Sequence, residues 1–353
     1  MTVSDWIRPE VGALTAYHVP DATGFIKLDA MENPFSLPSA LAPGLADALA
    51  AASLNRYPDP AASGLRDTLR RVAGIPAEYD LMLGNGSDEI IQVIALALAR
   101  PGATLMSVEP AFVMFKVIAE LTGLRYVGVP LTADFALDEA AVMSALARER
   151  PAVLFLACPN NPTGNLFDLD VVERVIRAAP GLVVVDEAYS AFAKESFLPR
   201  LGRHPNAVLM RTLSKLGLAG LRLGYLAGCR EWLAEFDKVR LPYNINALSQ
   251  AAARFALTHH DVLAAQAAVI VAERERVATA LAAMPGVWVF PSEANFLLFR
   301  VADADRLFAS LKSRKILVKN VSRAHPLLAD CLRVSMGTAV ENTAFLSAVE
   351  SSL

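Results

Sequence analysis

Residues 182–189 read Leu182-Val-Val-Val-Asp-Glu-Ala-Tyr189. The first four residues are apolar without polar alternation, which is typical of a strand buried on both faces, as in a parallel sheet covered by helices. Asp186 follows directly, at the end of the strand where ligands bind in open α/β sheets. This stretch therefore predicts an α/β fold with a polar site at the carboxyl ends of its strands.

Short apolar runs and amphipathic stretches alternate on both sides of this run. We predict strands at residues 81–83, 104–108, 126–129, 153–157, 182–185 and 208–211, and helices at 88–99, 112–121, 138–148 and 171–178. Strands that alternate with helices favour a parallel sheet with helices on both faces.

The pattern changes after about residue 229, which indicates a second domain. A long helical stretch at 252–283 precedes predicted strands at 287–290, 295–299, 316–318 and 332–336 and helices at 304–313 and from 342. We predict a large domain at 46–245 and a smaller α+β domain at 246–353. The N-terminal arm, 1–45, is expected to join the small domain and to pack on the rest of the chain or on a second subunit.

The composition is that of a well-packed globular chain, with 353 residues, 54% hydrophobic, 20% charged and a net charge of -3. These values fit neither disorder nor a nucleic-acid partner, so we expect small molecules or proteins as partners. The 3 cysteines are far apart and show no disulfide or zinc spacing. This cysteine pattern favours a reducing cytoplasm and no metal. The first residues lack a basic leader followed by an apolar core, so we predict neither export nor insertion into a membrane.

A lysine lies beside hydroxyl groups and a second cation in Arg211-Thr-Leu-Ser-Lys-Leu-Gly-Leu-Ala-Gly-Leu-Arg222. Such a loop can hold a buried amine against a phosphate and an aldehyde, which makes Lys215 a candidate Schiff-base lysine. A surface lysine is the alternative interpretation.

Three more polar stretches follow predicted strands. Gly84-Asn-Gly-Ser-Asp88 opens a helix, where backbone amides can bind a phosphate, although a plain capped turn would look the same. Asn160-Asn-Pro-Thr-Gly164 reads as a turn, from which Asn161 can donate its amide to a ring oxygen. A buried Asp186 needs a partner, and a helix cap or a salt bridge is the alternative role for it.

In this order, Asn161-Pro-Thr-Gly164, Asp186-Glu-Ala-Tyr189 and Ser214-Lys215 through Arg222 resemble the class I/II aminotransferases of pyridoxal-phosphate fold type I. The resemblance covers nearly the whole chain and implies a mostly parallel seven-stranded sheet between helices, plus a smaller α+β domain. It is most specific to the histidinol-phosphate aminotransferase branch. The stretches that carry this are Asn55-Arg-Tyr-Pro-Asp59, Ser87-Asp-Glu89, Arg211-Thr-Leu-Ser-Lys215, Ala219-Gly-Leu-Arg222 and Cys331-Leu-Arg-Val-Ser-Met-Gly-Thr338.

The resemblance implies a ping-pong transamination in histidine biosynthesis. L-histidinol phosphate would give its amino group to pyridoxal 5'-phosphate and become imidazole acetol phosphate, and 2-oxoglutarate would accept the group and become glutamate. Lys215 would form the aldimine with the cofactor and then act as general base and acid.

The resemblance also implies a cofactor site. Its residues would be Tyr57, Gly86, Ser87, Asp88, Phe112, Asn161, Asp186, Tyr189, Thr212, Ser214, Lys215 and Arg222. In the family, Asp186 would face the pyridinium nitrogen, Asn161 and Tyr189 the phenolic oxygen, and an aromatic ring would stack on the cofactor. Tyr57 would reach the phosphate of a neighbouring subunit, which implies a homodimer with shared sites.

The substrate-binding residues implied by the resemblance are Tyr17, Asn161, Lys319 and Arg333, and Asn295 is a further candidate for closing over the substrate. The chain departs from the commoner pattern at three places. Phe112 stands where many relatives have tyrosine, Lys319 stands where many have arginine, and the step from Lys215 to Arg222 is one residue shorter. A tighter loop is expected there, with Gly217 allowing it.

Other functions fit parts of this pattern. An aromatic amino-acid aminotransferase or a threonine-phosphate decarboxylase would share the fold and the lysine loop. A regulatory protein that only binds pyridoxal phosphate is the alternative from another class, although no DNA-binding segment is evident in the sequence.

Overall fold

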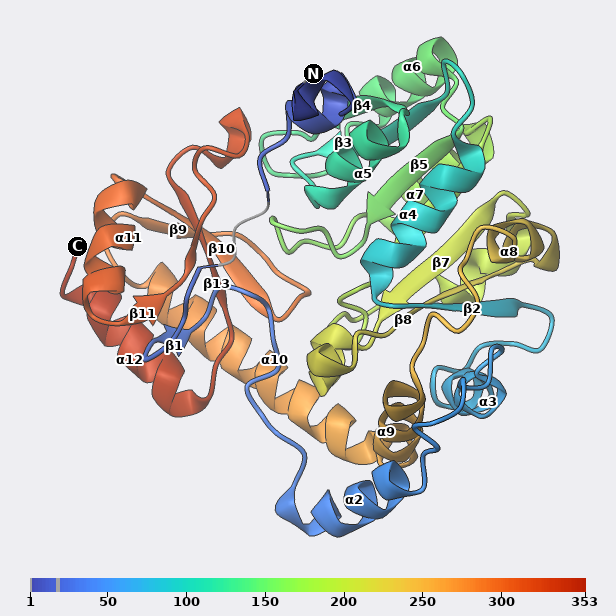
Figure 1. The fold of residues 1–353 in the computed structure, drawn as a ribbon. Coiled ribbons are helices and arrows are strands. Elements are labelled where there is room, and N and C mark those ends of the chain that lie inside the picture. Colours follow the sequence, from blue (N-terminus) through green and yellow to red (C-terminus); the bar gives the residue numbers. More distant parts are fainter. Residues whose placement is uncertain (1, 17–19) are drawn as a thin grey trace.

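The computed structural model describes residues 2–16 and 20–353 of the chain (Figure 1). Its main sheet has seven strands in the order β2-β8-β7-β6-β5-β3-β4, which confirms the predicted mostly parallel α/β sheet. The strands are β2 (Asp80–Gly84), β3 (Thr104–Glu109), β4 (Arg125–Pro130), β5 (Val153–Ala157), β6 (Leu182–Asp186), β7 (Ala207–Thr212) and β8 (Gly224–Gly228). In the described chain β8 is the strand that runs antiparallel to both of its neighbours, β2 and β7.

Two hydrophobic layers cover this sheet, one on each face. One layer includes α3 (Ser63–Val72), α6 (Glu139–Glu149), α7 (Leu169–Ala178) and α9 (Ala247–Thr258), and the other includes α4 (Ser87–Leu98), α5 (Met114–Thr122) and α8 (Arg230–Asp237). Along β6, Val183 and Val185 point into the first layer, while Leu182 and Val184 point into the second. The apolar run at 182–185 is therefore buried on both faces, as predicted.

A second, antiparallel sheet has the order β12-β13-β10-β9. It consists of β9 (Val287–Val289), β10 (Phe296–Val301), β12 (Lys319–Asn320) and β13 (Cys331–Ser335), and the helices around it are α10 (His260–Ala282), α11 (Ala304–Ser313) and α12 (Ala339–Glu350). Figure 1 shows this sheet beside the open end of the main sheet.

The prediction of one long helix at 252–283 was wrong. The segment forms α9 and α10, which meet at 75° across His259. α9 packs against α3 and α2 (Ala42–Ala50), so it lies with the main sheet, while α10 runs to the second sheet. In the described residues no single helix is both long enough and apolar enough to cross a membrane. The bent pair of α9 and α10 has the required length and composition only when the two helices are taken together.

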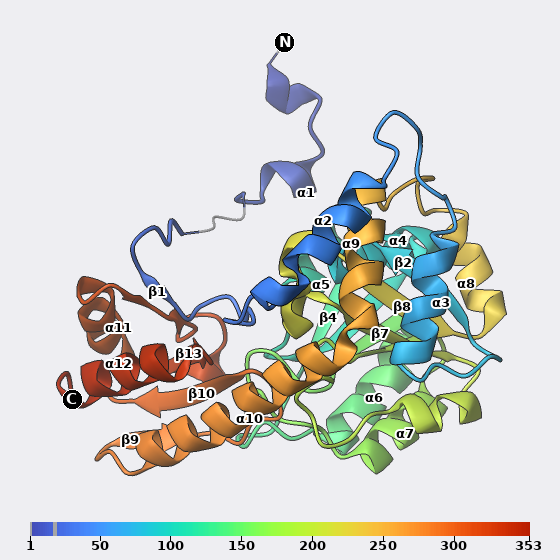
Figure 2. The ribbon, with the colours of Figure 1, turned by 90° about the horizontal axis from the view of Figure 1, so that it is seen from below.

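The first part of the N-terminal segment lies on the outside of the fold (Figure 2). It contains η1 (Val3–Asp5), α1 (Pro9–Gly12), β1 (Ile26–Lys27) and η2 (Ser39–Leu41). β1 pairs in parallel with β11 (Ile316–Leu317), which joins this segment to the C-terminal part of the chain. The predicted boundaries at 45 and 245 stay predictions.

Short turns of 3-10 or π helix complete the chain: η3 (Leu198–Arg203), η4 (Ser214–Leu218), η5 (Ala219–Leu221) and η6 (Pro326–Leu328). η4 and η5 follow β7 directly and carry the lysine loop. They place this loop at the same edge of the sheet as the end of β6.

Candidate active site

A cavity of about 190 Å³ opens at the carboxyl ends of β5, β6 and β7. The predicted cofactor residues that line it are Ser87, Asp88, Phe112, Asn161, Asp186, Tyr189, Thr212, Ser214, Lys215 and Arg222. They come from five separate stretches of sequence, and the sheet brings them together because the parallel strands end at one edge.

The Lys215 amine is buried in this cavity. Its Nζ donates a hydrogen bond to the carbonyl oxygen of Ala30 at 3.2 Å. Burial, together with the nearby Arg333 guanidinium, lowers the pKa of Lys215 from its ordinary 10.5 to about 8. A large fraction of this amine is therefore neutral in mildly alkaline solution, which a nucleophile or a general base requires.

Asp186 lies at the base of the cavity with only 4% of its surface exposed. Its Oδ1 accepts a hydrogen bond from the amide of Ala188 at 3.1 Å. Burial, together with the negative charges of Asp88 and Glu187, raises the pKa of Asp186 from its ordinary 3.8 to about 7. A carboxyl group in this state suits a ligand that brings a basic nitrogen to it.

The start of α4 and the loop after β7 meet in a corner whose groups are suited to an anion. Ser87 begins α4, and the first amides of a helix have no partners within the helix itself. Arg222 lies opposite, where its Nη2 is 3.7 Å from the carboxylate of Asp88 and its Nη1 donates to Ser214 Oγ at 3.4 Å. Thr212 Oγ1 donates to the same Ser214 Oγ at 3.0 Å, so two hydroxyls and a guanidinium meet here.

Gly86 makes room for this corner. It has φ +85°, and a Cβ at this residue would lie 2.6 Å from Arg222 Nη2. Arg222 itself has φ +52° and Gly217 has φ +119°. The short step from Lys215 to Arg222 is thus closed by two residues in left-handed backbone conformations, one of which is a glycine that adopts it freely.

The side walls of the cavity are aromatic and polar. Phe112 packs edge-on against Phe115 with ring centroids 5.6 Å apart. Tyr189 is buried against Phe296, with centroids 5.2 Å apart, and burial raises the pKa of its phenol. Asn161 Oδ1 accepts a hydrogen bond from Arg333 Nη1 at 2.6 Å.

Arg333 connects the cavity to the second sheet. It lies on β13, and its Nη2 donates to the carbonyl oxygen of Asp29 at 2.8 Å. Its guanidinium also lies 5.4 Å from the ring centroid of Phe296. Lys319 on β12 is the strand partner of Arg333. Two cations therefore lie side by side on the strands that face the cavity region.

The other predicted cofactor-binding and substrate-binding residues lie outside the lining of this cavity or outside the described residues. Among the described residues, Gly86, Tyr57, Lys319 and Arg333 are not part of the lining of this cavity. Tyr57 is 81% exposed and stacks on Tyr243, with ring centroids 4.5 Å apart. Tyr17 lies outside the described residues. Asn295 is buried and donates through Nδ2 to the carbonyl oxygen of Met31 at 2.9 Å, so it holds the N-terminal segment in place.

Sequence reasoning missed one wall of the cavity, which Ala30, Met31 and Glu32 form. Met31 has φ +53°, and its amide donates to Ser335 Oγ at 2.8 Å. Glu32 pairs with Lys27 at 2.5 Å. The available signal was a cluster of polar residues in Asp29-Ala-Met-Glu-Asn-Pro34, within an arm otherwise rich in proline and alanine.

Comparison with known proteins identifies the family. The model of the family "Aminotransferase class I and II" matches residues 23–349. Histidinol-phosphate aminotransferase 1 of Ralstonia nicotianae is 56% identical over 352 residues, which cover 98% of this chain and 94% of the relative. The histidinol-phosphate aminotransferase of Chromobacterium violaceum is 55% identical over 350 residues, 99% of this chain and 98% of the relative.

Solved structures have the same fold. The histidinol-phosphate aminotransferase from Sinorhizobium meliloti, in complex with pyridoxal-5'-phosphate, superposes with a TM-score of 0.87 at 25% identity, covering 98% of this chain and 97% of that one. The L-threonine-O-3-phosphate decarboxylase from Porphyromonas gingivalis superposes with a TM-score of 0.76 at 22% identity, covering 92% and 98%, which indicates the shared fold alone. The sequence match over nearly the whole chain and the shared architecture establish that this chain belongs to the class I and II aminotransferase family.

Proposed function

We propose that this chain is a pyridoxal-phosphate-dependent aminotransferase of histidine biosynthesis. It moves the amino group of L-histidinol phosphate to 2-oxoglutarate and yields imidazole acetol phosphate and glutamate. The observation that carries the proposal is the cavity in which the Lys215 amine faces the buried Asp186 carboxyl and the Arg222 corner. The names of relatives that are 56% identical over nearly the whole chain support the choice of donor.

The residues of the cavity fit pyridoxal phosphate group by group. The corner of α4, Ser214 and Arg222 suits the phosphate, because the guanidinium of Arg222 can bind two oxygens and Gly86 leaves it room. Asp186 suits the pyridine nitrogen, and Phe112 offers a flat face to the ring. Bound here, the cofactor supplies an aldehyde that condenses with amines and a ring that stabilises negative charge on the substrate Cα.

Lys215 moves the proton in this reaction. With the cofactor bound, its Nζ would take the proton from the substrate Cα and later give it back, and a pKa near 8 suits a group that must both accept and donate. The carbonyl of Ala30 orients the amine. Asp186, with a pKa of about 7, holds a proton that it can share with a basic ring nitrogen.

Arg333 is the proposed partner of both substrates. Its guanidinium is held by Asn161 Oδ1 and by the Asp29 carbonyl, on the side of the cavity where Tyr189 stands. Histidinol phosphate has no α-carboxylate, so we infer that Arg333 binds its phosphate and later a carboxylate of 2-oxoglutarate. Lys319, its strand neighbour, adds a second positive charge for the phosphate.

We also propose a homodimer in which each subunit completes the site of the other. Tyr57 is 81% exposed, and Leu54 at 74% and Leu241 at 73% lie on the same two loops. Tyr57 and Tyr243 stack and connect these loops. Exposed apolar side chains gathered in this way are typical of protein interfaces.

A donor panel tests the proposed reaction. Initial rates with 2-oxoglutarate should give the highest kcat/KM for L-histidinol phosphate, with glutamate formed in equal amount to the donor consumed. A higher kcat/KM for phenylalanine would indicate an aromatic aminotransferase instead. Release of carbon dioxide from L-threonine O-3-phosphate would indicate a decarboxylase.

A further inference from the structure

Two charged residues inside the family motifs have no role in the site described above. Glu187 follows Asp186 at the end of β6, and Arg211 precedes the end of β7. Their side chains form a buried ion pair, with Arg211 Nη2 at 2.7 Å and Nε at 2.9 Å from Glu187 Oε2. The side chain of Glu187 is 3% exposed and that of Arg211 12%.

Further hydrogen bonds surround this pair. Glu187 accepts from Ser196 Oγ at 3.0 Å and from the amide of Phe197 at 2.5 Å. Arg211 donates to Ser196 Oγ at 2.9 Å and to the hydroxyl of Tyr225 at 3.4 Å. One network thus connects the ends of β6, β7 and β8 with the loop before η3.

The ion pair joins β6 and β7 just beyond the last residues that are paired through their backbones. β6 and β7 are in register up to Asp186 and Met210, and the amide of Glu187 still donates to the Met210 carbonyl at 2.8 Å. Beyond this point the segment after β6 leads to Tyr189, and the end of β7 leads into the loop at Thr212–Lys215. The side chains of Glu187 and Arg211 hold the two diverging ends together.

Arg211 lies outside the active-site cavity, at a second cavity next to it. A second cavity, of about 290 Å³, is lined by Arg211, Ser196 and Tyr225, while Ala188 and Thr212 line both cavities. In the described part of the chain neither Glu187 nor Arg211 lines the active-site cavity. Apart from the Glu187 charge, which raises the pKa of Asp186, the pair can therefore act on the cavity through the positions of its sequence neighbours Asp186, Ala188 and Thr212.

We propose that Glu187 and Arg211 are the positioning pair of the active site, which fixes the Asp186 carboxyl at a set distance and angle from the Ser214–Lys215 loop. The inference rests on the proposed function for the group that Asp186 and Lys215 bind. A cofactor held at its ring nitrogen by one loop and at its aldehyde by the other needs both loops in a fixed relation, since small displacements of reacting groups cost large factors in rate.

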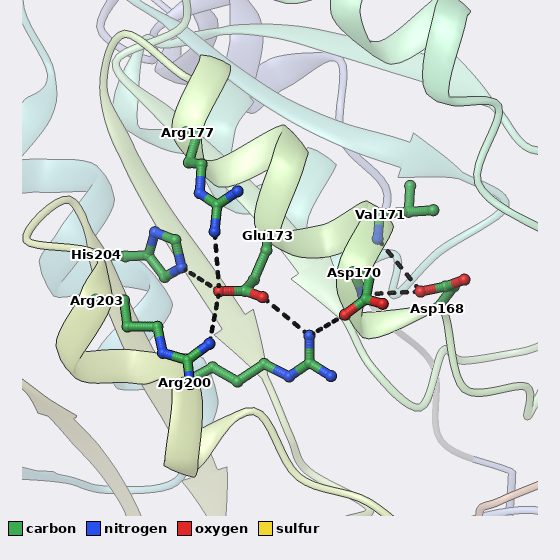
Figure 3. A network of polar contacts seen from close by, with 8 residues as sticks. All are labelled: Asp168, Asp170, Val171, Glu173, Arg177, Arg200, Arg203 and His204. Atoms are coloured by element: carbon green, nitrogen blue, oxygen red, sulfur yellow. Dashed lines mark hydrogen bonds and ion pairs between the residues drawn. The ribbon is translucent and has the colours of Figure 1, made fainter.

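A matched control lies elsewhere in the same layer of the fold. Glu173 on α7 is also a buried carboxylate, 6% exposed, and contacts His204 at 2.9 Å and Arg200 at 3.0 Å (Figure 3). Figure 3 shows Arg177 and Arg203 directed at the same carboxylate, so this network ties α7 to η3. In the residues that the structure describes, none of these four partners lines the active-site cavity.

Three variants of the full chain test the proposal. Glu187→Gln leaves Arg211 buried without its counter-charge, and the double variant Glu187→Leu/Arg211→Met removes both charges, a change that is often neutral for stability. Glu173→Gln is the control. For each chain we would measure the unfolding midpoint without cofactor, the dissociation constant for added pyridoxal phosphate, and the pH titration of the bound cofactor's absorbance.

The proposal predicts that the double variant unfolds near the wild-type temperature but binds pyridoxal phosphate about tenfold more weakly, with a displaced absorbance titration. Glu187→Gln should show the same weakening together with a lower midpoint. Glu173→Gln should lower the midpoint and leave the dissociation constant within about twofold of wild type. A folded double variant with wild-type cofactor affinity and titration would overturn the proposal. Failure of the wild-type chain itself to bind pyridoxal phosphate would instead overturn the proposed function.

Discussion

Burial changes the acid–base properties of two cavity residues in opposite directions. It lowers the pKa of Lys215 to about 8 and raises that of Asp186 to about 7. The charged form of each group is disfavoured because few polar partners replace water around it. Near neutral pH both groups can therefore exchange protons, which is the property that the proposed roles of Lys215 and Asp186 require.

The pH dependence of cofactor uptake follows from Lys215. Only the neutral amine attacks an aldehyde, so the rate at which the cofactor-free chain takes up pyridoxal phosphate should rise with pH and level off above about pH 8. Arg333→Gln removes a charge that lowers this pKa, so its inflection should lie at higher pH. Stopped-flow absorbance measures both profiles. An inflection that stays in place or moves to lower pH in Arg333→Gln would contradict the assignment.

Asp186 should make the cofactor-free chain less stable as the pH rises. Its pKa is about 7 in the fold and near 3.8 when unfolded, so between these values the native chain binds the additional proton. The free energy of unfolding should then fall with rising pH by up to about 4 kcal/mol across this window. Asp186→Asn, which cannot titrate, should lack this loss. Urea unfolding at several pH values checks it, and parallel curves for the two chains would count against a buried carboxyl with a raised pKa.

At the scale of elements, the strand ends were predictable because a doubly buried strand has an apolar run with a polar residue after it. The run at 182–185 is followed directly by Asp186, and the stretch at 153–157 is followed, after two further residues, by Asn160; the structure has β6 and β5 there. The bend at His259 was not predictable, since the apolar residues on both sides continue a helical pattern and tertiary packing alone decides the break. β8 also escaped prediction, because glycines stand at both of its ends and leave an apolar run of only three residues between them.

Gly86 tests the close approach of α4 and the lysine loop. Alanine at this residue would be strained at φ +85° and its Cβ would displace Arg222, so Gly86→Ala should weaken pyridoxal phosphate binding about tenfold and cost about 1–3 kcal/mol of stability. Gly102→Ala is the matched control, with φ +76° and, within the described residues, no atom within 4 Å of an added Cβ. Fluorescence titration of both chains measures the affinity. Equal affinity in the two variants would show that the room beside Arg222 is not needed.

At the scale of the whole molecule, the site depends on segments far apart along the chain. The motifs that bind the proposed ring and phosphate could be read from sequence, because each has its own local pattern of strand, turn and polar residue. The wall at Ala30–Glu32 could not, since Lys215 and Ala30 are 185 residues apart and meet only through the packing of the two sheets. Tyr57 is 81% exposed and does not line the cavity of its own chain, so its role toward a second subunit stays a prediction.

Shared sites can be tested by mixing variants. In a dimer of one Lys215→Ala chain and one Tyr57→Ala chain, one site combines both defects and the other is intact if Tyr57 acts on the neighbouring subunit. Co-expressed chains that pair at random should then recover about one quarter of the wild-type activity, because about half of the dimers are mixed. The assay is run at limiting pyridoxal phosphate. Activity equal to the mean of the two separate variants would place Tyr57 outside the shared site.

The half-reactions of the cofactor-loaded enzyme test the central claim most directly. Addition of L-histidinol phosphate alone should abolish the visible absorbance of the lysine-bound cofactor, and subsequent 2-oxoglutarate should restore it with one glutamate formed per site. Lys215→Ala should fail to complete this cycle. An unchanged spectrum when L-histidinol phosphate is added to the loaded wild-type enzyme would contradict the proposed function.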